Sequence, residues 1–289
     1  MPNMRPVPTV RRRRLGQALR QYRNAAGLSL DTAARAMEWI GPKLSRIETA
    51  NGYIRPTEVA PLLKAYGVVD PEVVSALEAL AKDARKQGWW QTYTGILSPS
   101  YADYISLESD ADSIREFSPL LVPGLLQSAA YARESISANA ITRTAEEVAA
   151  LAEVRQARQA VLTRPGGPLK LWAVIHEAAL HQRFALRPAT MREQLRRLLD
   201  AAEMPNVTIQ VMPLDATPHP GNVGGFGLVG FPSPMPDVVL LENLIGSSYV
   251  EGVDDVRTFA DAFERIVAAA LPTDDSLALI ARIEEKQRT

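Results

Sequence analysis

The stretch GPKLSRIETANGYIRP, residues 41–56, lies in the only strongly basic part of the chain and predicts a short helix that begins near Gly41. Leu44 and Ile47 are three residues apart, so they lie on one face of this helix and form its inner side. Gly41 and Pro42 occupy the first turn, where proline presets the backbone angle φ of a helix. Lys43 and Arg46 give the helix a basic face, and Gly41 and Pro42 leave very little side chain at its tip. The question is what surface such a helix contacts.

Four further short helices are predicted around this one. In the helix that precedes it, Ser29 suits the N-cap, because its hydroxyl can accept a hydrogen bond from a free backbone N–H. The small residues Ala33 and Ala34 lie on the inner face of that helix. The other helices are predicted to begin near Leu15, Pro56 and Pro71, the last running towards Gln87. Five short helices joined by connections of a few residues predict a compact all-α domain.

Charge is distributed unevenly along the chain. Residues 1–66 contain 12 Lys/Arg and 4 Asp/Glu, a net charge of +8, whereas residues 67–289 contain 20 Lys/Arg and 29 Asp/Glu, a net charge of -9. This asymmetry predicts an anionic partner at the N-terminal end only. The four arginines at 11–14 fit either a basic N-terminal arm or an ordinary solvated face.

The order of residues 20–68 resembles the helix-turn-helix domain of the Cro and phage-repressor class, also called the XRE type. The resemblance rests on Gly27-Leu28-Ser29, the pair Ala33-Ala34, the sequence LSRIE at 44–48, Gly52, Pro56 and the closing LLKAYGV at 62–68. It implies that the helix beginning at Gly41 enters the major groove of double-stranded DNA. A small residue pair in the preceding helix allows the close packing that this geometry needs.

The resemblance also implies which residues face the DNA. Gly41, Pro42 and Arg46 correspond to positions that face base edges, and Lys43 lies beside them. Because glycine and proline have no side-chain donor, base reading falls to Arg46, which suits guanine, and to Lys43. The predicted DNA-binding residues are Gly41, Pro42, Lys43, Ser45, Arg46, Asn51, Tyr53 and Arg55. The last three contact phosphates or form an ordinary polar surface.

One acidic residue stands out in this basic region. In the Cro-like class the acid at the position of Glu48 pairs with an arginine late in the first helix, and the matching residue is Arg23. The resemblance therefore implies a buried structural pair that fixes the angle of the third helix. The alternative is two exposed side chains whose pairing contributes less than about 1 kcal/mol.

The composition changes after residue 88, and the chain is expected to divide there. Residues 1–70 form the DNA-binding domain with its basic arm, residues 71–88 a connecting helix, and residues 89–289 a second domain. The double tryptophan at 89–90, SPSYADYISLE at 98–108 and FSPLLVPGLLQSAAYARE at 117–134 resemble a group of actinobacterial regulators. In that group a C-terminal domain of unknown function follows the helix-turn-helix. The resemblance also implies an antitoxin-like pairing with a small protein encoded next to it.

Periodicity predicts a mixed α+β fold for this second domain. Strands are predicted at 169–175, 207–212, 226–231 and 238–242, and helices at 144–162, 188–202, 253–270 and 274–286. Glu242 lies in an otherwise apolar strand, where it faces a pocket or serves as a partnered structural carboxylate.

Five aromatic residues gather near the start of the second domain. They are Trp89, Trp90, Tyr93, Tyr101 and Tyr104. They fit core packing, because such side chains bury large areas, or a site for a small-molecule effector or a protein partner.

Several chemistries are disfavoured by the sequence. The absence of cysteine removes disulfides and thiolate chemistry and agrees with a reducing, cytoplasmic location. No apolar run is long enough for a membrane span, and no secretory signal is present. Gly225-Phe226-Gly227-Leu228-Val229-Gly230 fits a dinucleotide motif but leads into prolines rather than a helix. His176 and His181 are five residues apart, which separates them on a helix, so neither a metal nor another cofactor is expected.

The sequence thus predicts a dimeric, sequence-specific DNA-binding transcription regulator with a sensing or partner-binding C-terminal domain, and not an enzyme. The alternative is an antitoxin-like interaction protein that binds a small partner protein and regulates its own operon. Because a single recognition helix with few base-reading groups provides little affinity, two half-sites and a homodimer are expected.

Overall fold

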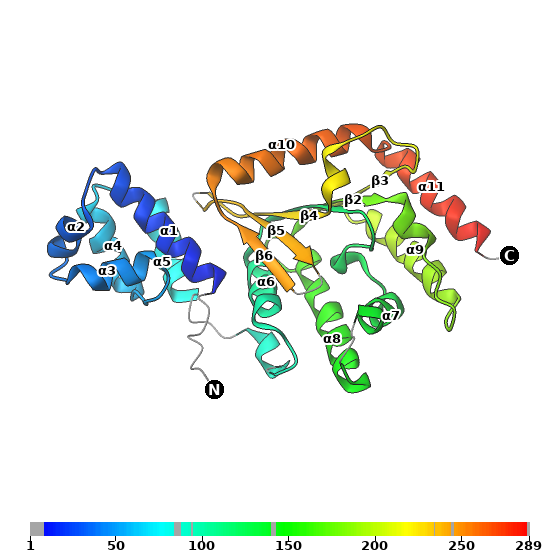
Figure 1. Ribbon diagram of the computed structural model, residues 1–289, viewed down its shortest axis with the longest axis horizontal. Coiled ribbons are helices and arrows are strands. Elements are labelled where there is room, and N and C mark those ends of the chain that lie inside the picture. The colour runs from blue at the N-terminus through cyan, green and yellow to red at the C-terminus, as the bar shows by residue number, and fades with distance from the viewer. Residues whose placement is uncertain are drawn as a thin grey trace. The chain divides into compact units, whose positions relative to one another are not determined.

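The computed structural model describes residues 9–83, 88–93, 95–139, 143–233, 235–243 and 246–287 (Figure 1). The chain divides into two compact units. The N-terminal domain comprises Met1–Trp89 with Pro232–Pro236, and the C-terminal domain comprises Trp90–Phe231 with Asp237–Thr289. Within these described segments, no helix combines the length and apolar character needed to cross a bilayer.

The N-terminal domain contains the five predicted helices. They are α1 (Val10–Ala25), α2 (Leu30–Ala36), α3 (Gly41–Glu48), α4 (Pro56–Ala65) and α5 (Pro71–Asp83). Each contributes to one apolar core, in which Leu19, Leu44, Leu62 and Leu63 are fully buried. The helical prediction for this part of the chain is therefore confirmed.

Local signals set the end of α1 and the start of α2. The Ser29 hydroxyl accepts a hydrogen bond from Thr32 N at 3.1 Å and so satisfies one of the free N–H groups of the first turn. Gly27, at φ +67°, supplies the left-handed conformation that ends α1. These two residues fix the tight connection between the first two helices.

Two glycines mark the closest helix–helix approaches. A Cβ at Gly16 of α1 would lie 2.6 Å from the Ile47 carbonyl oxygen of α3. A Cβ at Gly41 would collide with the Asp31 carboxylate of α2. The small tip of α3 is thus explained by packing inside the domain.

The basic run at 11–14 belongs to the first turns of α1. Arg11 and Arg14 are buried, with 7% and 1% of their surface exposed. These two arginines therefore form neither an extended arm nor a solvated face. Residues 1–8, the rest of the expected arm, lie outside the described residues.

The C-terminal domain is built on one six-stranded mixed sheet. Its strands are β1 (Ser113–Ser118), β2 (Lys170–His176), β3 (Val207–Met212), β4 (Phe226–Gly230), β5 (Val238–Asn243) and β6 (Gly246–Val250). Their order is β3-β2-β1-β4-β5-β6. Strands β1, β2 and β3 are parallel, whereas β4 runs antiparallel to β1, β5 to β4 and β6 to β5.

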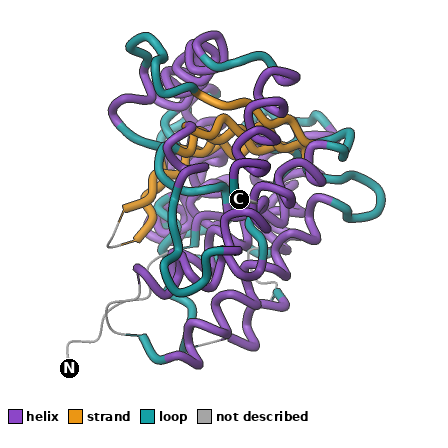
Figure 2. Tube along the Cα trace, turned by 90° about the vertical axis from the view of Figure 1, so that its right-hand side faces the viewer, coloured by secondary structure: helices purple, strands orange, loops and turns teal. Residues whose placement is uncertain are grey.

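Helices cover both faces of this sheet (Figures 1 and 2). They are α6 (Pro99–Asp110), α7 (Ala129–Asn139), α8 (Ala145–Arg158), α9 (Ala189–Ala202), α10 (Val253–Ala269) and α11 (Thr273–Lys286), with short 3-10 turns at Trp89–Tyr93, Gly124–Leu126, Gln159–Leu162, Glu177–His181 and Pro220–Val223. One core packs α6, α7, α9 and α11 against the sheet. A second core packs α10 against the opposite face through Phe263 and Ile266.

The mixed α+β prediction is confirmed, with two strands and two helices, α6 and α7, added. All four predicted strands are present, whereas β1 and β6 were missed. The glycine motif at 225–230 forms β4, as its prolines indicated, and does not open a helix. The segment that contains His176 and His181 is a strand end followed by a 3-10 turn.

Candidate DNA interface and ligand cavity

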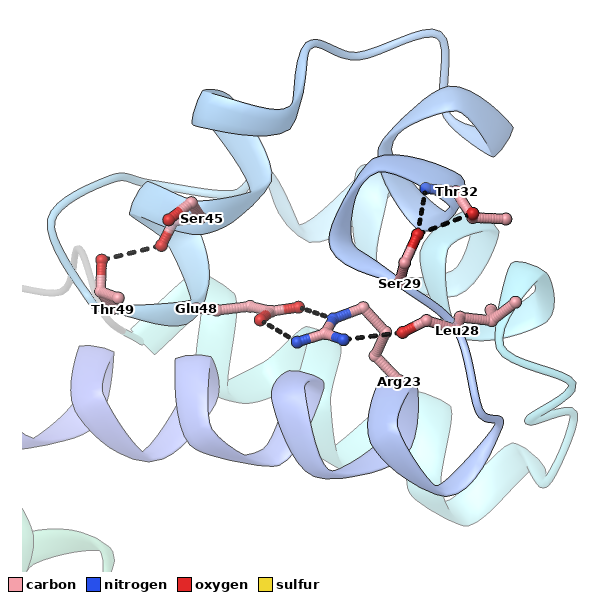
Figure 3. A network of polar contacts seen from close by, with 7 residues as sticks. All are labelled: Arg23, Leu28, Ser29, Thr32, Ser45, Glu48 and Thr49. Atoms are coloured by element: carbon pink, nitrogen blue, oxygen red, sulfur yellow. Dashed lines mark hydrogen bonds and ion pairs between the residues drawn. The ribbon is translucent and has the colours of Figure 1, made fainter.

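The angle of α3 is set by a buried ion pair (Figure 3). Arg23 Nε donates to Glu48 Oε1 at 2.7 Å, and Arg23 Nη2 donates to Glu48 Oε2 at 2.9 Å. The third donor group, Nη1, reaches the Leu28 carbonyl oxygen at 2.8 Å. The hydrogen bonds to Glu48 raise the pKa of Arg23. The pair implied by the family resemblance is therefore present, and it joins α1, α3 and the α1–α2 turn.

Arg46 presents an unpaired cation on the outer face of α3. Its side chain is exposed, and within the described residues its guanidinium has no ion-pair partner. Pro42 is exposed one turn earlier, and Ser45 is half-buried, with its carbonyl oxygen accepting from the Thr49 hydroxyl at 2.7 Å. Arg46 is thus accessible, and its contact with a base stays a prediction.

Lys43 has a different environment from the one expected. Its ammonium forms an ion pair with Glu58 Oε1 at 3.0 Å and lies 3.6 Å from the centre of the Trp39 ring. Glu58 Oε2 in turn accepts from Arg55 N at 2.8 Å and caps α4. Burial raises the pKa of Glu58, but these contacts outweigh it and lower that pKa overall. Lys43 is therefore held by its own domain, and base reading by Lys43 would require it to leave Glu58.

The loop after α3 places three predicted residues at the surface. Asn51, Tyr53 and Arg55 are all exposed. The Arg12 guanidinium lies 4.7 Å from the centre of the Tyr53 ring, and the Asn51 amide donates to the Thr49 carbonyl oxygen at 3.2 Å. These side chains are accessible, and their phosphate contacts stay a prediction.

Ile40 is a surface residue that the sequence reasoning missed. It is the N-cap residue of α3, and 70% of its surface is exposed. An apolar side chain at the tip of a recognition helix is suited to the methyl group of thymine. The available signal was an isoleucine immediately before the Gly-Pro that opens α3.

The C-terminal domain contains a cavity of about 610 Å³. It lies over β1, β4 and β5 and is closed by α6, α7, α8 and the segment after β1. Its apolar lining includes Tyr101, Tyr104, Phe117, Leu125, Phe226 and Leu240, and its polar lining includes Glu116, Gln127, Asn139, Arg155, Arg158 and Glu242. Volume and lining are typical of sites for small organic ligands.

The strand register places a glycine, Gly227, beside Glu116 in the floor of this cavity. Glu116 of β1 lies opposite Ala173 of β2 and Gly227 of β4, and Gly227 lies opposite Leu240 of β5. A Cβ at Gly227 would meet only the Leu240 Cβ, at 3.9 Å. The missing side chain beside Glu116 therefore leaves room above the sheet.

Glu116 is the titratable group with the most unusual environment on this floor. Burial and the nearby carboxylate of Glu242 raise its pKa to about 7, although the Ser118 hydroxyl donates to Oε1 at 2.7 Å. Arg158 acts in the opposite direction and Glu108 adds to the rise. Glu116 therefore changes charge near neutral pH.

A buried cluster joins the helices that close the cavity. Arg158 Nε and Nη2 donate to the two carboxylate oxygens of Glu108 at 2.8 and 2.7 Å, and Nη1 donates to the Tyr101 hydroxyl at 2.7 Å. The guanidinium also lies 4.8 Å from the centre of the Tyr104 ring. Burial alone raises the pKa of Tyr101, but Arg158 and Arg155 outweigh it and lower that pKa.

The aromatic residues expected at an effector site are divided between two places. Tyr101 and Tyr104 line the cavity, whereas Trp89, Trp90 and Tyr93 form a 3-10 turn outside its lining. Glu242 also lines the cavity, and within the described residues no cation pairs with it. Of its two predicted roles, the pocket-facing one fits the structure.

Several cavity residues were missed from the sequence, namely Glu116, Phe117, Gln127, Arg155, Arg158, Phe226 and Gly227. Their common cause is the missed strand β1, which brings Glu116 beside β4. The usable signal was a lone glutamate in the sequence SIREFS, two residues after Ile114 and next to Phe117.

We expect Glu116→Gln to raise the free energy of unfolding at about pH 8 by up to about 3 kcal/mol, and to leave it nearly unchanged near pH 4. The folded-state pKa is raised above the ordinary value of 4.5, so the stability contributed by the protonated carboxyl is present at low pH and is lost as pH rises through about 7. Denaturant unfolding at both pH values measures the difference.

The exposed Glu153→Gln on α8 serves as the control for this pH effect and should follow the parent protein at both pH values. An equal change in the free energy of unfolding of the Glu116 variant at both pH values would contradict the claim that the ionised Glu116 carboxylate is unfavourable.

The fold and the two sites define a class: a helix-turn-helix protein with a separate α+β domain that holds a cavity. A model described as a helix-turn-helix domain matches residues 14–77. A model described as a domain of unknown function (DUF5753) matches residues 101–282, more than half of the chain, and the protein belongs to this family. No curated protein and no solved structure shows significant similarity to the chain.

Proposed function

We propose that this protein is a cytoplasmic, sequence-specific DNA-binding transcription regulator of the Cro and phage-repressor type, whose DNA affinity responds to a small molecule bound in the C-terminal cavity. The observation that supports DNA binding best is the exposed and unpaired Arg46 on the outer face of α3. The Arg23–Glu48 pair supports this role because it holds α3 rigidly at its packed angle.

The C-terminal domain is proposed as a binding domain rather than an enzyme. Among the described residues, no group of His, Cys, Asp or Glu side chains is arranged to hold a metal ion. The cavity, with its aromatic and charged walls, supports a small molecule as the effector.

Dimerisation is part of the proposal, because one recognition helix with a single base-reading arginine needs a second half-site for useful affinity. No feature of the cavity or of α3 favours the antitoxin-like alternative over a ligand-controlled regulator.

Replacing Arg46 with alanine tests the DNA-reading role. If Arg46 donates to guanine O6 and N7, the variant should lose about 1–3 kcal/mol of discrimination at one base pair, while general affinity falls less. Sequences selected by the parent protein from a random DNA pool provide the operator, and binding is then measured on all single-base variants of that operator over a range of salt concentrations.

Arg257→Ala is the matched control, because Arg257 is an exposed arginine on α10 of the other domain. It should leave the preference at every base pair unchanged. An Arg46 variant that retains the parental preference throughout would remove Arg46 from the reading role.

A further inference from the structure

The cavity has two polar ends that the protein leaves uncompensated. At the sheet end, Glu116 of β1 and Glu242 of β5 lie on the same face of the sheet, because Glu116 shares a cross-strand row with Leu240 and Glu242 follows two residues later on β5. Within the described part of the chain, neither carboxylate forms an ion pair. Among the described residues, the Glu116 side chain accepts one hydrogen bond, from the Ser118 hydroxyl.

This end of the cavity favours a bound cation. A half-buried carboxylate such as Glu116 is unfavourable without a counter-charge, and the exposed carboxylate of Glu242 on the same face of the sheet adds repulsion. The pKa of Glu116 is raised to about 7 by burial and by Glu242, which agrees with an unfavourable charge at this position. A ligand ammonium group placed between the two carboxylates would relieve both effects.

The helix end of the cavity has the opposite character. Arg155 of α8 donates from Nη1 to Gln127 Oε1 at 3.0 Å, and that partner is neutral. Its Nε is buried and has no hydrogen-bond partner among the described residues. No acidic side chain of the described residues pairs with Arg155, so its guanidinium has donors available for a carboxylate.

The middle of the cavity is neutral and apolar. The charge of Arg158 is matched by Glu108, which it binds through two hydrogen bonds. The rings of Tyr101 and Tyr104 form the walls there, and Gly227 leaves the floor open beside Glu116. An apolar body fits this space better than a polar one.

We propose that the C-terminal cavity binds an amphipathic zwitterion, with a protonated amine against Glu116 and Glu242, an apolar body above Gly227 and a carboxylate against Arg155. The inference rests on the proposed function only in taking this cavity as the effector site; the ligand chemistry does not depend on DNA binding.

Calorimetric titration of the full chain without DNA tests the ligand class. The probes are ω-aminohexanoic, ω-aminooctanoic and ω-aminododecanoic acid, with octylamine and octanoic acid as probes that carry one charge. At a pH above 7.5, roughly, where Glu116 is ionised, the best amino acid should bind at least about tenfold more tightly than either single-charge probe. Tighter binding of octylamine or octanoic acid, or no binding of any amino acid in the series, would overturn the proposal.

Variants locate each charge of the bound molecule. Glu116→Gln should weaken the binding of ω-aminooctanoic acid and of octylamine about tenfold and leave the binding of octanoic acid unchanged. Arg155→Gln should weaken the binding of ω-aminooctanoic acid and of octanoic acid about tenfold and leave the binding of octylamine unchanged. Glu153→Gln, an exposed substitution on the same helix as Arg155, should change none of them. Equal effects of both cavity variants on all three probes would contradict the assigned ends.

Gly227→Val tests the location, because Gly227 lines the cavity and a Cβ there would meet only the Leu240 Cβ, at 3.9 Å, so the valine side chain would take up space that the ligand needs. It should abolish binding of every probe, and retained binding would place the ligand elsewhere. The affinity for the selected operator DNA is measured separately, with and without the amino acid. Tight binding of the amino acid without any change in that affinity would support the ligand class and refute ligand control of DNA binding.

Discussion

Replacing Arg23 with methionine is expected to lower the free energy of unfolding of the N-terminal domain by about 3–5 kcal/mol. The substitution keeps the apolar stem and removes the guanidinium, so Glu48 is left buried without a cation. Only 3% of the Glu48 side chain is exposed, which excludes effective hydration of its carboxylate. Leu28 also loses the donor to its carbonyl oxygen, and the α1–α2 turn loosens.

A double-mutant cycle separates this loss from simple changes in packing. Glu48→Leu alone should be similarly destabilising, whereas the combined Arg23→Met and Glu48→Leu variant should be nearly as stable as the parent, because a buried pair contributes little beyond well-packed apolar residues. Arg20→Ala, an exposed arginine one turn earlier on α1, is the control. A coupling energy near zero in denaturant unfolding would show that the pair has no structural role.

DNA binding provides a second measurement on the same variants. The combined variant lacks the bidentate contact that fixes α3, so it should bind the operator more weakly than the parent even where its stability is restored. Unchanged affinity would mean that the apolar packing of Leu44 and Ile47 alone fixes the angle of α3.

Local signals made the helices of the N-terminal domain predictable from sequence. Ser29 caps α2, Gly27 ends α1 and proline opens α4, and each effect acts within a few residues. The Arg23–Glu48 pair came from family resemblance, since spacing alone does not bring residues 25 positions apart together.

Contacts between distant residues explain what the sequence did not reveal in this domain. Lys43 was expected at the DNA, but its partner Glu58 lies 15 positions further on and is oriented by its own capping role in α4. Gly41 was predicted to face the base edges, and the structure adds that a Cβ at this position would collide with the Asp31 carboxylate. Neither contact leaves a periodic trace in the sequence.

The cavity was less predictable because its floor depends on strand order. Only Ile114 and Phe117 of the six residues in β1 are apolar, so the strand lacks the apolar run that marked β4 and β5 in the sequence. Tyr101, Tyr104 and Glu242 were singled out by residue type alone. Their placement around one cavity follows only when β4 pairs between β1 and β5.

Glu108→Gln is expected to lower the free energy of unfolding of the C-terminal domain by about 3–5 kcal/mol. Arg158 and Glu108 are 5% and 1% exposed, so the substitution leaves the Arg158 charge buried with only neutral acceptors. The ion pair with Glu108 raises the pKa of Arg158 against the opposing effect of burial, so the guanidinium does not escape by losing its proton. The pair joins the last turns of α6 and α8, and its loss should also weaken ligand binding by disturbing Tyr101.

An exposed ion pair of the same domain provides the comparison for this last variant. Arg187 and Glu134 lie 3.3 Å apart, but 52% of the arginine side chain is exposed, so Glu134→Gln should cost less than about 1 kcal/mol. Replacing both members of the buried pair, Glu108→Leu with Arg158→Met, should recover most of the stability lost by Glu108→Gln alone. The recovered protein should still bind ligands poorly, because Tyr101 loses its hydrogen bond from Arg158 and the cavity wall is no longer fixed. If the single substitution were as mild as that at Glu134, the Arg158–Glu108 pair would be too well hydrated to act as the support of the cavity.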